Sequence, residues 1–469
     1  MRRTIAVALA TLLALAGYVT LDIVDKAPGI LTLAPEPAPP APTSRPSTPA
    51  VLPSLATPGM PLAPAGAAAP APTSAGVQAA LGAVLADPRL AGRVSAVVRD
   101  GLTGAHLLDV APDAPRVPAS VLKLATAAAV TAALPVGATA DTTVVLEPGA
   151  ARVVLVAGGD TLLDPGPGDP TAVAGRAGLA TLAAQTAQAL RANGIGHVTL
   201  GLDLSFGAGP PVAPTWLPTY RPTGITGPVT MLALATHRAT PGQPAPADPP
   251  GEVLAAFAAR LTEAQIAVTV DKAPRPVAAG SSEIARVASA PIADQMALAL
   301  VESDNALTEA IARQAAARSG GGTDFAGTAA WVRHTLTGLG LDLTGVHTVD
   351  ASGLSRQNLV PARLLVDVLE LGVADKVPAW RATVAALAVG HLTGTLTERF
   401  AEADGLAGAG VVRGKTGTLT GVDSLAGTVV TADGRLLTFA VLYQGSGGTS
   451  TTRAALDRFG ATLATCGCR

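Results

Sequence analysis

Residues 118–123 read Pro118-Ala119-Ser120-Val121-Leu122-Lys123, and we expect a helix to open here and run to about residue 134. Positions i and i+3 lie on one helical face, so the Lys123 amine can reach the Ser120 hydroxyl. A lysine whose pKa is lowered by partial burial and nearby positive charge can take the proton of a serine nucleophile. The helix start also offers backbone N–H groups, that of Ser120 among them, to an oxyanion. Taken alone, a helix-capping serine beside a solvated lysine is the simpler interpretation.

A second motif, Ser303-Asp304-Asn305, stands between two segments with helical patterns, 293–302 and 306–317. The Ser303 hydroxyl can pass a proton between Lys123 and a leaving amine, and the Asn305 amide can bind a peptide carbonyl of the substrate. The same three residue types also make a good helix N-cap, which is the simpler interpretation of this motif by itself.

A third motif, Lys415-Thr416-Gly417-Thr418, follows one short apolar strand and precedes another. A lysine and two hydroxyls at a strand edge suit a substrate carboxylate, and Gly417 lets the backbone approach closely. The Thr418 N–H is then a second oxyanion donor. An exposed lysine in a glycine-bounded turn is the alternative.

Taken together, the three motifs favour the catalytic interpretation over the simpler structural one. Each occurs once, and the chain has five lysines, of which two fall in these motifs. They follow one another in the order used by penicillin-binding proteins and serine β-lactamases. Chance is therefore a poor explanation for the set.

Further stretches resemble one branch, the class C penicillin-binding proteins, which are D-alanyl-D-alanine carboxypeptidase/endopeptidases of the DacB type. The likeness rests on residues 118–120, on Leu-Val-Ala-Gly-Gly-Asp-Thr-Leu at 155–162, on Asp-Ala-Ser-Gly-Leu-Ser-Arg at 350–356 and on Gly-Thr-Leu at 394–396. It covers the chain from about residue 76 to its end. Ala351 replaces the glycine that is more frequent in this branch.

The resemblance implies a role for individual residues. Ser120 is the acylated nucleophile and Lys123 its base, and the site is completed by Ser303, Asn305, Lys415 and Thr416, with Gly417 and Thr418 beside the substrate. Ser352 and Arg356 match positions that help to bind the diaminopimelate end of the stem peptide. Asp203 aligns loosely with an acid that pairs with the amine of that end. A surface charge is the alternative for Arg356, and an ordinary structural acid for Asp203.

The implied fold class is α/β (α+β), a penicillin-binding-protein/β-lactamase-like transpeptidase core with a large, mainly β insertion. We expect the core at 76–138 and 286–469 and the inserted domain or domains at 139–285, where no sustained helical repeat is visible. The separation of Ser120 from Ser303 by roughly 180 residues supports the insertion, because ordinary connections are far shorter.

The N-terminal region predicts export. Arg2 and Arg3 precede an apolar run over 5–19, so we expect a signal peptide or signal-anchor at 1–34. A Pro/Ala-rich linker at 35–75 follows and would hold the catalytic body on the cell-wall side of the membrane.

Composition narrows the partners. A net charge of −2 and a pI of about 6.3 argue against a nucleic-acid or anionic-membrane surface as the main partner. The six histidines are scattered without zinc-binding spacing, so neither a metal nor another cofactor is expected. The two cysteines, Cys466 and Cys468, belong to the tail; a bridge over so short a separation is strained, and we expect no catalytic duty there.

These observations predict a serine-type D-Ala-D-Ala carboxypeptidase, with or without DD-endopeptidase activity, that acts on peptidoglycan stem peptides and is inhibited by β-lactam antibiotics. One alternative is a β-lactamase, but the Glu-x-x-Leu-Asn segment that commonly supplies its deacylating base is not found. Another is a wall-binding homologue that has lost turnover, although every acyl-transfer residue is present.

Overall fold

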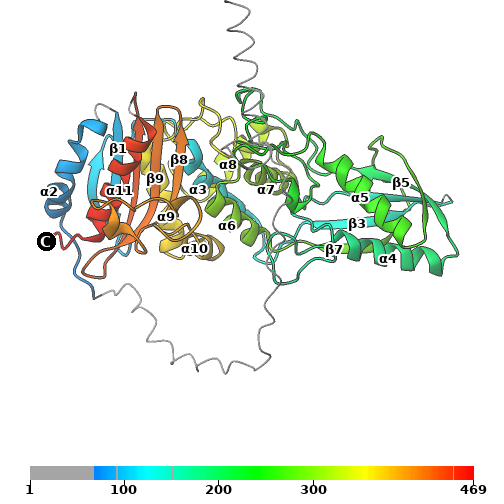
Figure 1. Cartoon of the computed structure of the whole chain (residues 1–469). Helices are drawn as coiled ribbons and strands as arrows, with labels where there is room; N and C mark the ends of the chain where they lie inside the picture. The colour runs from blue at the N-terminus through cyan, green and yellow to red at the C-terminus, as the bar shows by residue number, and fades with distance from the viewer. Residues whose placement is uncertain (1–67, 91–92, 150, 447) are drawn as a thin grey trace, which may run out of the picture. The chain divides into compact units, whose positions relative to one another are not determined.

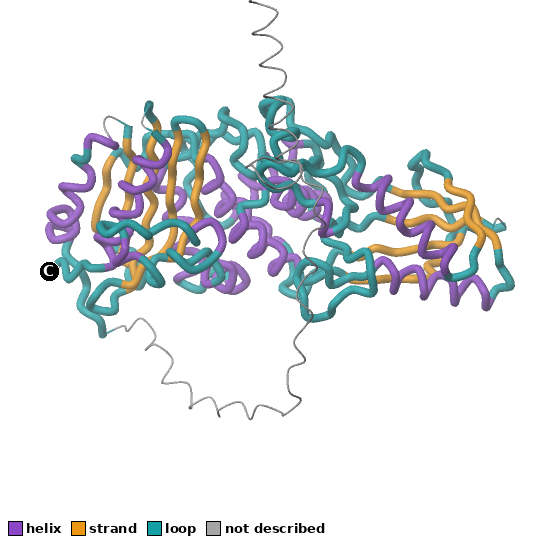
Figure 2. The backbone as a smooth tube through the Cα atoms, viewed as in Figure 1, coloured by secondary structure: helices purple, strands orange, loops and turns teal. Residues whose placement is uncertain are grey.

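The computed structural model describes residues 68–469 except 91–92, 150 and 447. The predicted signal or anchor at 1–34 and the linker up to residue 67 therefore lie outside the described residues. The strands of the described chain form two five-stranded sheets, with the orders β2-β1-β10-β9-β8 and β6-β5-β4-β3-β7 (Figures 1 and 2). Helices pack against both.

The first sheet is antiparallel and joins the two ends of the chain. Its strands are β1 (Val94–Asp100), β2 (His106–Val110), β8 (Arg413–Leu419), β9 (Val422–Val430) and β10 (Leu436–Gln444). Strand β1 pairs with β10, and Val97 lies opposite Ala440. Residues on both faces of β9 and β10 are buried, which requires helices on both sides of the sheet. Strand β8 is an edge, so its free side is open to the nucleophile segment and to substrate.

Two groups of helices cover this sheet. One face packs against α2 (Ser74–Leu85) and α11 (Thr449–Ala464), and the other packs against α3 (Leu122–Ala133) and α9 (Ala362–Val373). The remaining core helices are α6 (Ile292–Glu302), α7 (Asn305–Arg318), α8 (Phe325–Gly338) and α10 (Pro378–Ala385). The expected helices from the sequence are all present, with ends shifted by a few residues.

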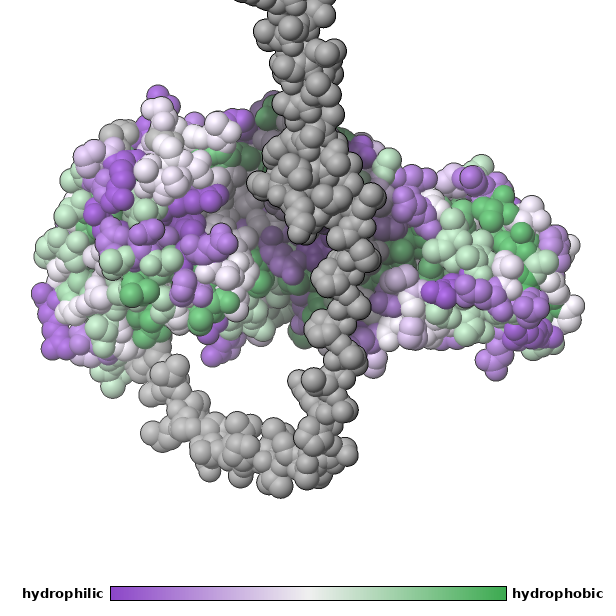
Figure 3. Space-filling model, in the orientation of Figure 1, coloured by the Kyte–Doolittle hydropathy of each residue, from purple (hydrophilic) through white to green (hydrophobic). Residues whose placement is uncertain are grey.

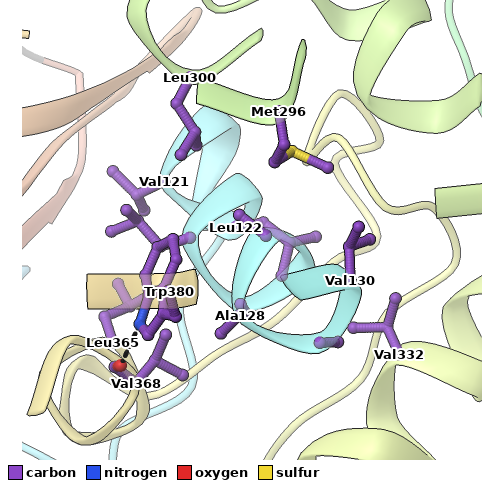
Figure 4. Close-up of a cluster of buried hydrophobic side chains, with 14 of the residues drawn as sticks. Val121, Leu122, Ala128, Val130, Met296, Leu300, Val332, Leu365, Val368 and Trp380 are labelled. Atoms are coloured by element: carbon purple, nitrogen blue, oxygen red, sulfur yellow. Dashed lines mark hydrogen bonds between the residues drawn. The ribbon is translucent and has the colours of Figure 1, made fainter. Parts of the chain in front are cut away.

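Helix α3 lies at the centre of the helical layer. Its residues from Leu122 to Thr131 are buried on every side, as expected of a helix that is apolar all round. In Figure 4, α3 side chains such as Leu122 and Val130 are surrounded by Met296, Val332 and Trp380 from other helices. The site lysine that α3 carries is thereby held in a rigid, water-poor setting.

The second sheet belongs to the insertion. It contains β3 (Asp141–Leu146), β4 (Arg152–Val156), β5 (His197–Asp203), β6 (Ala267–Val270) and β7 (Ser282–Ala288). Strands β4, β5 and β6 are parallel, and helices α4 (Leu179–Ala192) and α5 (Pro249–Glu263) connect them. Parallel neighbours need such crossover connections. The sheet extends to Ala288, past the expected boundary at residue 285.

The expectation that the insertion lacks a sustained helical pattern was wrong for these two crossovers. The buried side of α4 follows the i, i+3, i+4 spacing of an amphipathic helix and consists of Leu179, Leu182, Ala183, Thr186, Ala187 and Leu190. Alanine and threonine make up half of this stripe, yet the helical spacing is visible in the sequence.

The described helices, the surface and the C-terminal cysteines each have one feature that relates to the sequence predictions. Within residues 68–469, apart from the masked positions, no helix has the length and apolar character needed to cross a bilayer. Hydrophilic and hydrophobic residues are interspersed over the visible face of the described part (Figure 3). Cys466 and Cys468 are bonded to each other, beside the start of α2.

Candidate active site

Segments that are distant in the chain line a single cleft. Ser120 lies there with Ser303 and Asn305 from the α6–α7 junction and with Thr416 and Thr418 from edge strand β8. Part of the opposite wall comes from the insertion, including Tyr220 and Ile225, together with the turn 238–241. The three sequence motifs thus converge at one place, as their order predicted.

Ser120 and Lys123 meet at the start of α3. A short 3-10 helix, Ala119–Val121, precedes α3, and Ala119 adopts a φ of 51° that is unfavourable for a residue with a Cβ. The Lys123 Nζ donates to Ser120 Oγ at 3.0 Å. The expected i, i+3 contact is therefore present.

Lys123 is fully buried and has two further partners. Its Nζ donates to Asn305 Oδ1 at 2.6 Å and to the carbonyl oxygen of Ser352 at 2.8 Å. Burial lowers the pKa of Lys123 to about 8, although the charges of Asp350, Glu309 and Asp304 oppose this shift. About a tenth of Lys123 is then unprotonated at pH 7 and can accept the Ser120 proton.

The Ser303-Asp304-Asn305 turn owes its shape to helix capping. Ser303 ends α6 in the left-handed region with a φ of 60°, and Asp304 caps α7 by accepting from the Leu307 N–H at 2.9 Å. The capping interpretation and the catalytic one thus both apply, because the cap turns Ser303 and Asn305 toward the cleft. The Asn305 amide is divided between Lys123 and the insertion, donating from Nδ2 to the Ile225 carbonyl at 2.8 Å.

Lys415 differs from the sequence expectation. Its side chain is fully buried, and its Nζ donates to Ser303 Oγ and to the Thr416 carbonyl, each at 2.8 Å. Burial and the neighbouring Lys123 hold its pKa well below the usual value. The amine therefore lies behind Ser303, which lines the cleft together with Thr416 and Thr418.

Gly417 allows β8 to approach the nucleophile segment. A Cβ at this position would lie 2.2 Å from Ser424 Oγ, 2.7 Å from the Pro118 carbonyl oxygen and 3.0 Å from the Ser120 nitrogen. Any side chain would push the strand away. The glycine thus keeps the Thr418 backbone near that of Ser120, as an oxyanion-binding pair requires.

The segment 350–356 supports the site mostly from behind. Ser352 is fully buried, does not line the cleft, and accepts from Lys123 through its carbonyl. Its expected part in binding the stem peptide stays a prediction. Gly353, with a φ of 83°, lies so close to Ala119 that a Cβ would clash with its carbonyl. Arg356 does line the cleft, and its Nη1 donates to the Thr420 carbonyl at 2.9 Å.

Asp203 is not brought to the cleft. It ends β5 in the insertion, is buried, and accepts hydrogen bonds from the Ser205 and Val277 N–H groups at 2.8 and 2.9 Å. Both carboxylate oxygens therefore hold loops of the insertion together, and the structural interpretation of this acid fits its surroundings.

The sequence interpretation missed Glu309. This acid is fully buried one helical turn after Asn305, and its Oε1 accepts from the Ala351 and Ser352 N–H groups at 3.0 and 2.7 Å. Burial, followed by the charge of Asp350, raises its pKa to about 8. The signal available in the sequence is an acid on the same face of α7 as Asn305.

Asp350 organises the same segment from the other side. Its carboxylate accepts from the Ser355 N–H at 2.7 Å and from the Trp216 indole N–H of the insertion at 2.8 Å. Two acids thus fix the backbone that presents the Ser352 carbonyl to Lys123. Among the described residues, no group of His, Cys, Asp and Glu side chains is arranged to hold a metal ion.

Comparison with known proteins agrees with this geometry. A model of the D-Ala-D-Ala carboxypeptidase 3 (S13) family matches residues 77–243 and 235–463. The chain is 37% identical to "Carboxypeptidase DacB" of Mycolicibacterium smegmatis over 431 residues, covering 90% of each chain, and 35% identical to a carboxypeptidase of Mycobacterium tuberculosis over 85% of each. The crystal structure of penicillin binding protein 4 from Haemophilus influenzae is similar in fold, with a TM-score of 0.64, 19% identity, and coverage of 82% of this chain and 98% of that one.

Proposed function

The chain belongs to the D-Ala-D-Ala carboxypeptidase 3 (S13) family, and on that premise we propose that Ser120 and Lys123 carry out its carboxypeptidase reaction through an acyl-enzyme. The observation that carries this assignment is the position of the Lys123 amine, 3.0 Å from the Ser120 hydroxyl and fully buried. A buried amine with a pKa of about 8 is suited to act as a general base near neutral pH.

In the first step, Ser120 Oγ attacks the carbonyl carbon of the penultimate D-Ala, and its proton passes to Lys123 Nζ. The oxyanion faces the backbone N–H groups of Ser120 and Thr418, which edge strand β8 presents beside the nucleophile. When the tetrahedral intermediate collapses, the C–N bond breaks, and the proton held by Lys123 passes through the Ser303 hydroxyl to the departing D-Ala amine, which leaves Lys123 unprotonated again. Lys415 positions that hydroxyl, because its Nζ donates to Ser303 Oγ.

In the second step, a water molecule attacks the acyl carbon and gives one proton to Lys123. The bond between the acyl carbon and Ser120 Oγ then breaks, and Lys123 returns that proton to Oγ as the shortened peptide leaves with a new carboxyl group. A β-lactam presents a similar carbonyl to the same serine and, once opened, stays tethered to the enzyme as an ester. A related structure of penicillin binding protein 4 from Haemophilus influenzae is complexed with a β-lactam, which supports such a reaction here.

The wider role of the cleft follows from its walls. We assign Arg356, exposed at the cleft beside the insertion, to the side-chain end of a peptidoglycan stem peptide. Export to the cell-wall side, with an N-terminal signal or anchor, remains part of this proposal. It is supported by the apolar run after Arg2 and Arg3.

Mass spectrometry tests the assignment directly. After exposure to benzylpenicillin, the peptide that contains Ser120 should carry one penicilloyl group, and Ser120→Ala should carry none. Wild type should release D-Ala from a pentapeptide, whereas Ser120→Ala should not. An adduct on another residue, or equal release by both proteins, would refute the assignment of Ser120.

A further inference from the structure

Arg453 is a cation at the cleft to which the sequence motifs assign no role. It lies in the first turns of α11, and Thr449 and Ser450 of the same helix also line the cleft. Its side chain is 43% exposed, and its Nη2 donates to the Thr418 hydroxyl at 3.1 Å. The guanidinium thus adjoins one of the two hydroxyls that face the substrate.

A substrate that ends in D-Ala carries a carboxylate next to the scissile bond, and the third motif alone does not supply a cation for it. Lys415 is fully buried and does not line the cleft. Its Nζ donates hydrogen bonds to the Ser303 hydroxyl and to the Thr416 carbonyl. Its pKa is also held well below normal. The hydroxyls of Thr416 and Thr418 carry no charge, and in this structure they donate to Thr395 and Asp423.

Of the three other arginines that line the cleft, Arg356 is assigned to the side-chain end of the stem peptide, and Arg238 and Arg399 already have acidic partners. Arg238 is paired with both Glu302 and Asp304. Arg399 is buried in a pair with Asp457. The partner carboxylates occupy N–H donors of these two guanidinium groups and neutralise their charge, so neither group is well placed to bind a substrate carboxylate.

Arg453 also has an acidic neighbour, but its contact with that acid is longer and its side chain is more exposed. Its Nε lies 3.7 Å from the buried Asp423 carboxylate, beyond hydrogen-bonding distance. Asp423 itself accepts from the hydroxyls of Thr418 and Thr452. The acid therefore orients Arg453 from behind, while the exposed part of the fork remains available to a planar anion.

We propose that the Arg453 guanidinium binds the terminal carboxylate of the peptide substrate at the part of the cleft that Thr416 and Thr418 line. Arg453 is then a specificity residue that selects peptides with a free C-terminus. This inference rests on the proposed function, because it places the carboxylate beside Ser120. The ring carboxylate of a penicillin would use the same group.

The test removes the positive charge of Arg453 from the enzyme and, separately, the negative charge of the terminal carboxylate from the peptide. Wild type and Arg453→Gln are compared on two acyl donors that differ only in their end, a peptide ending in D-Ala-D-Ala carboxylate and its carboxamide. We expect Arg453→Gln to lower kcat/KM for the carboxylate by about tenfold to a hundredfold, and to change kcat/KM for the carboxamide by less than about threefold. Arg453→Lys keeps the charge but lacks the planar guanidinium, so its kcat/KM for the carboxylate peptide should lie between those of wild type and Arg453→Gln.

Two further variants serve as controls. Arg458 lies on the same helix but pairs with Asp87 away from the cleft, so Arg458→Gln should leave the preference for the carboxylate unchanged. Arg356→Gln should affect both peptides equally, because that residue is assigned to another part of the substrate.

Equal losses on the two peptides with Arg453→Gln, or no loss on either, would overturn the inference, since a merely structural role predicts the former. Failure of wild type to release D-Ala from the carboxylate peptide is a separate outcome. It would instead refute the proposed function.

Discussion

Lys123 and Asn305, 182 positions apart in the chain, are joined by a hydrogen bond of 2.6 Å between Nζ and Oδ1. The bond joins the first turn of α3 to the first residue of α7, and the other end of the same amide donates to the Ile225 carbonyl of the insertion. One side chain therefore couples the base to both the helical layer and the insertion.

The pH dependence of acylation should follow Lys123. Because the unprotonated amine is the base and burial lowers its pKa to about 8, the rate constant for penicillin acylation should rise roughly tenfold per pH unit below 8 and level off above it. Stopped-flow acylation between pH 5.5 and 9.5 measures this. Lys123→Arg, which cannot lose its proton, should be inactive throughout. A flat profile from pH 6 to 8 would contradict the role of Lys123.

Asn305→Ala should impair both folding and chemistry. It removes one of the three acceptors of the Lys123 amine and the amide donor to the Ile225 carbonyl, which should cost about 1–3 kcal/mol in the free energy of unfolding and at least about tenfold in acylation. Denaturant titration and penicillin kinetics give the two values. Asn305→Asp keeps the acceptor but adds a negative charge, so its acylation profile should move to higher pH. An unchanged profile for that variant would show that the side chain does not act on Lys123.

Gly417→Ala should slow acylation by about tenfold or more. The new Cβ would lie within 3.0 Å of the Ser120 nitrogen and closer still to the Pro118 carbonyl, so β8 must move away from the nucleophile. Acylation kinetics and D-Ala release measure the loss. Gly82→Ala is the matched control, because nothing lies within 4 Å of a Cβ there. Equal rates for wild type and Gly417→Ala would mean that the close approach is not needed.

Glu309→Ala should reduce acylation although Glu309 does not line the cleft. Without it, the N–H groups of Ala351 and Ser352 lose their buried acceptor, and the Ser352 carbonyl that binds Lys123 loses its fixed orientation. The free energy of unfolding should fall by about 1–3 kcal/mol. Glu309→Gln keeps an acceptor oxygen and should restore most of the acylation rate. If the glutamine variant were as slow as the alanine variant at equal stability, simple positioning would be excluded.

Breaking the Asp100–Arg435 pair should change stability alone. Both side chains are buried, and two hydrogen bonds of 2.7 and 2.9 Å join them across the first sheet, far from the residues that line the cleft. Arg435→Met leaves a buried carboxylate unpaired, which should cost about 3–5 kcal/mol of unfolding free energy. Thermal or denaturant unfolding measures this. At temperatures where the variant is folded, its kcat/KM should match wild type.

Much of the site could be predicted because helical geometry is local. The contact between Ser120 and Lys123 follows from their spacing at a helix start, and the turn at Ser303 follows from residue types that cap helices. The core elements were predicted where apolar residues repeat strongly. Helices α4 and α5 were missed although their buried residues follow the helical spacing, and the insertion's sheet continues past the expected boundary to Ala288.

The sequence by itself predicted the chemistry, since the three motifs, their order and their resemblance to a family indicate a nucleophile, its base and the reaction. Only the tertiary structure decided which charged groups face the cleft. Lys415 is buried behind Ser303, whereas the Arg453 side chain is 43% exposed. Asp203 and Glu309 are buried and accept hydrogen bonds from backbone N–H groups. The physical reason is that burial and pairing depend on segments hundreds of residues away. The energy of a charge is set by those surroundings and not by its neighbours in the chain.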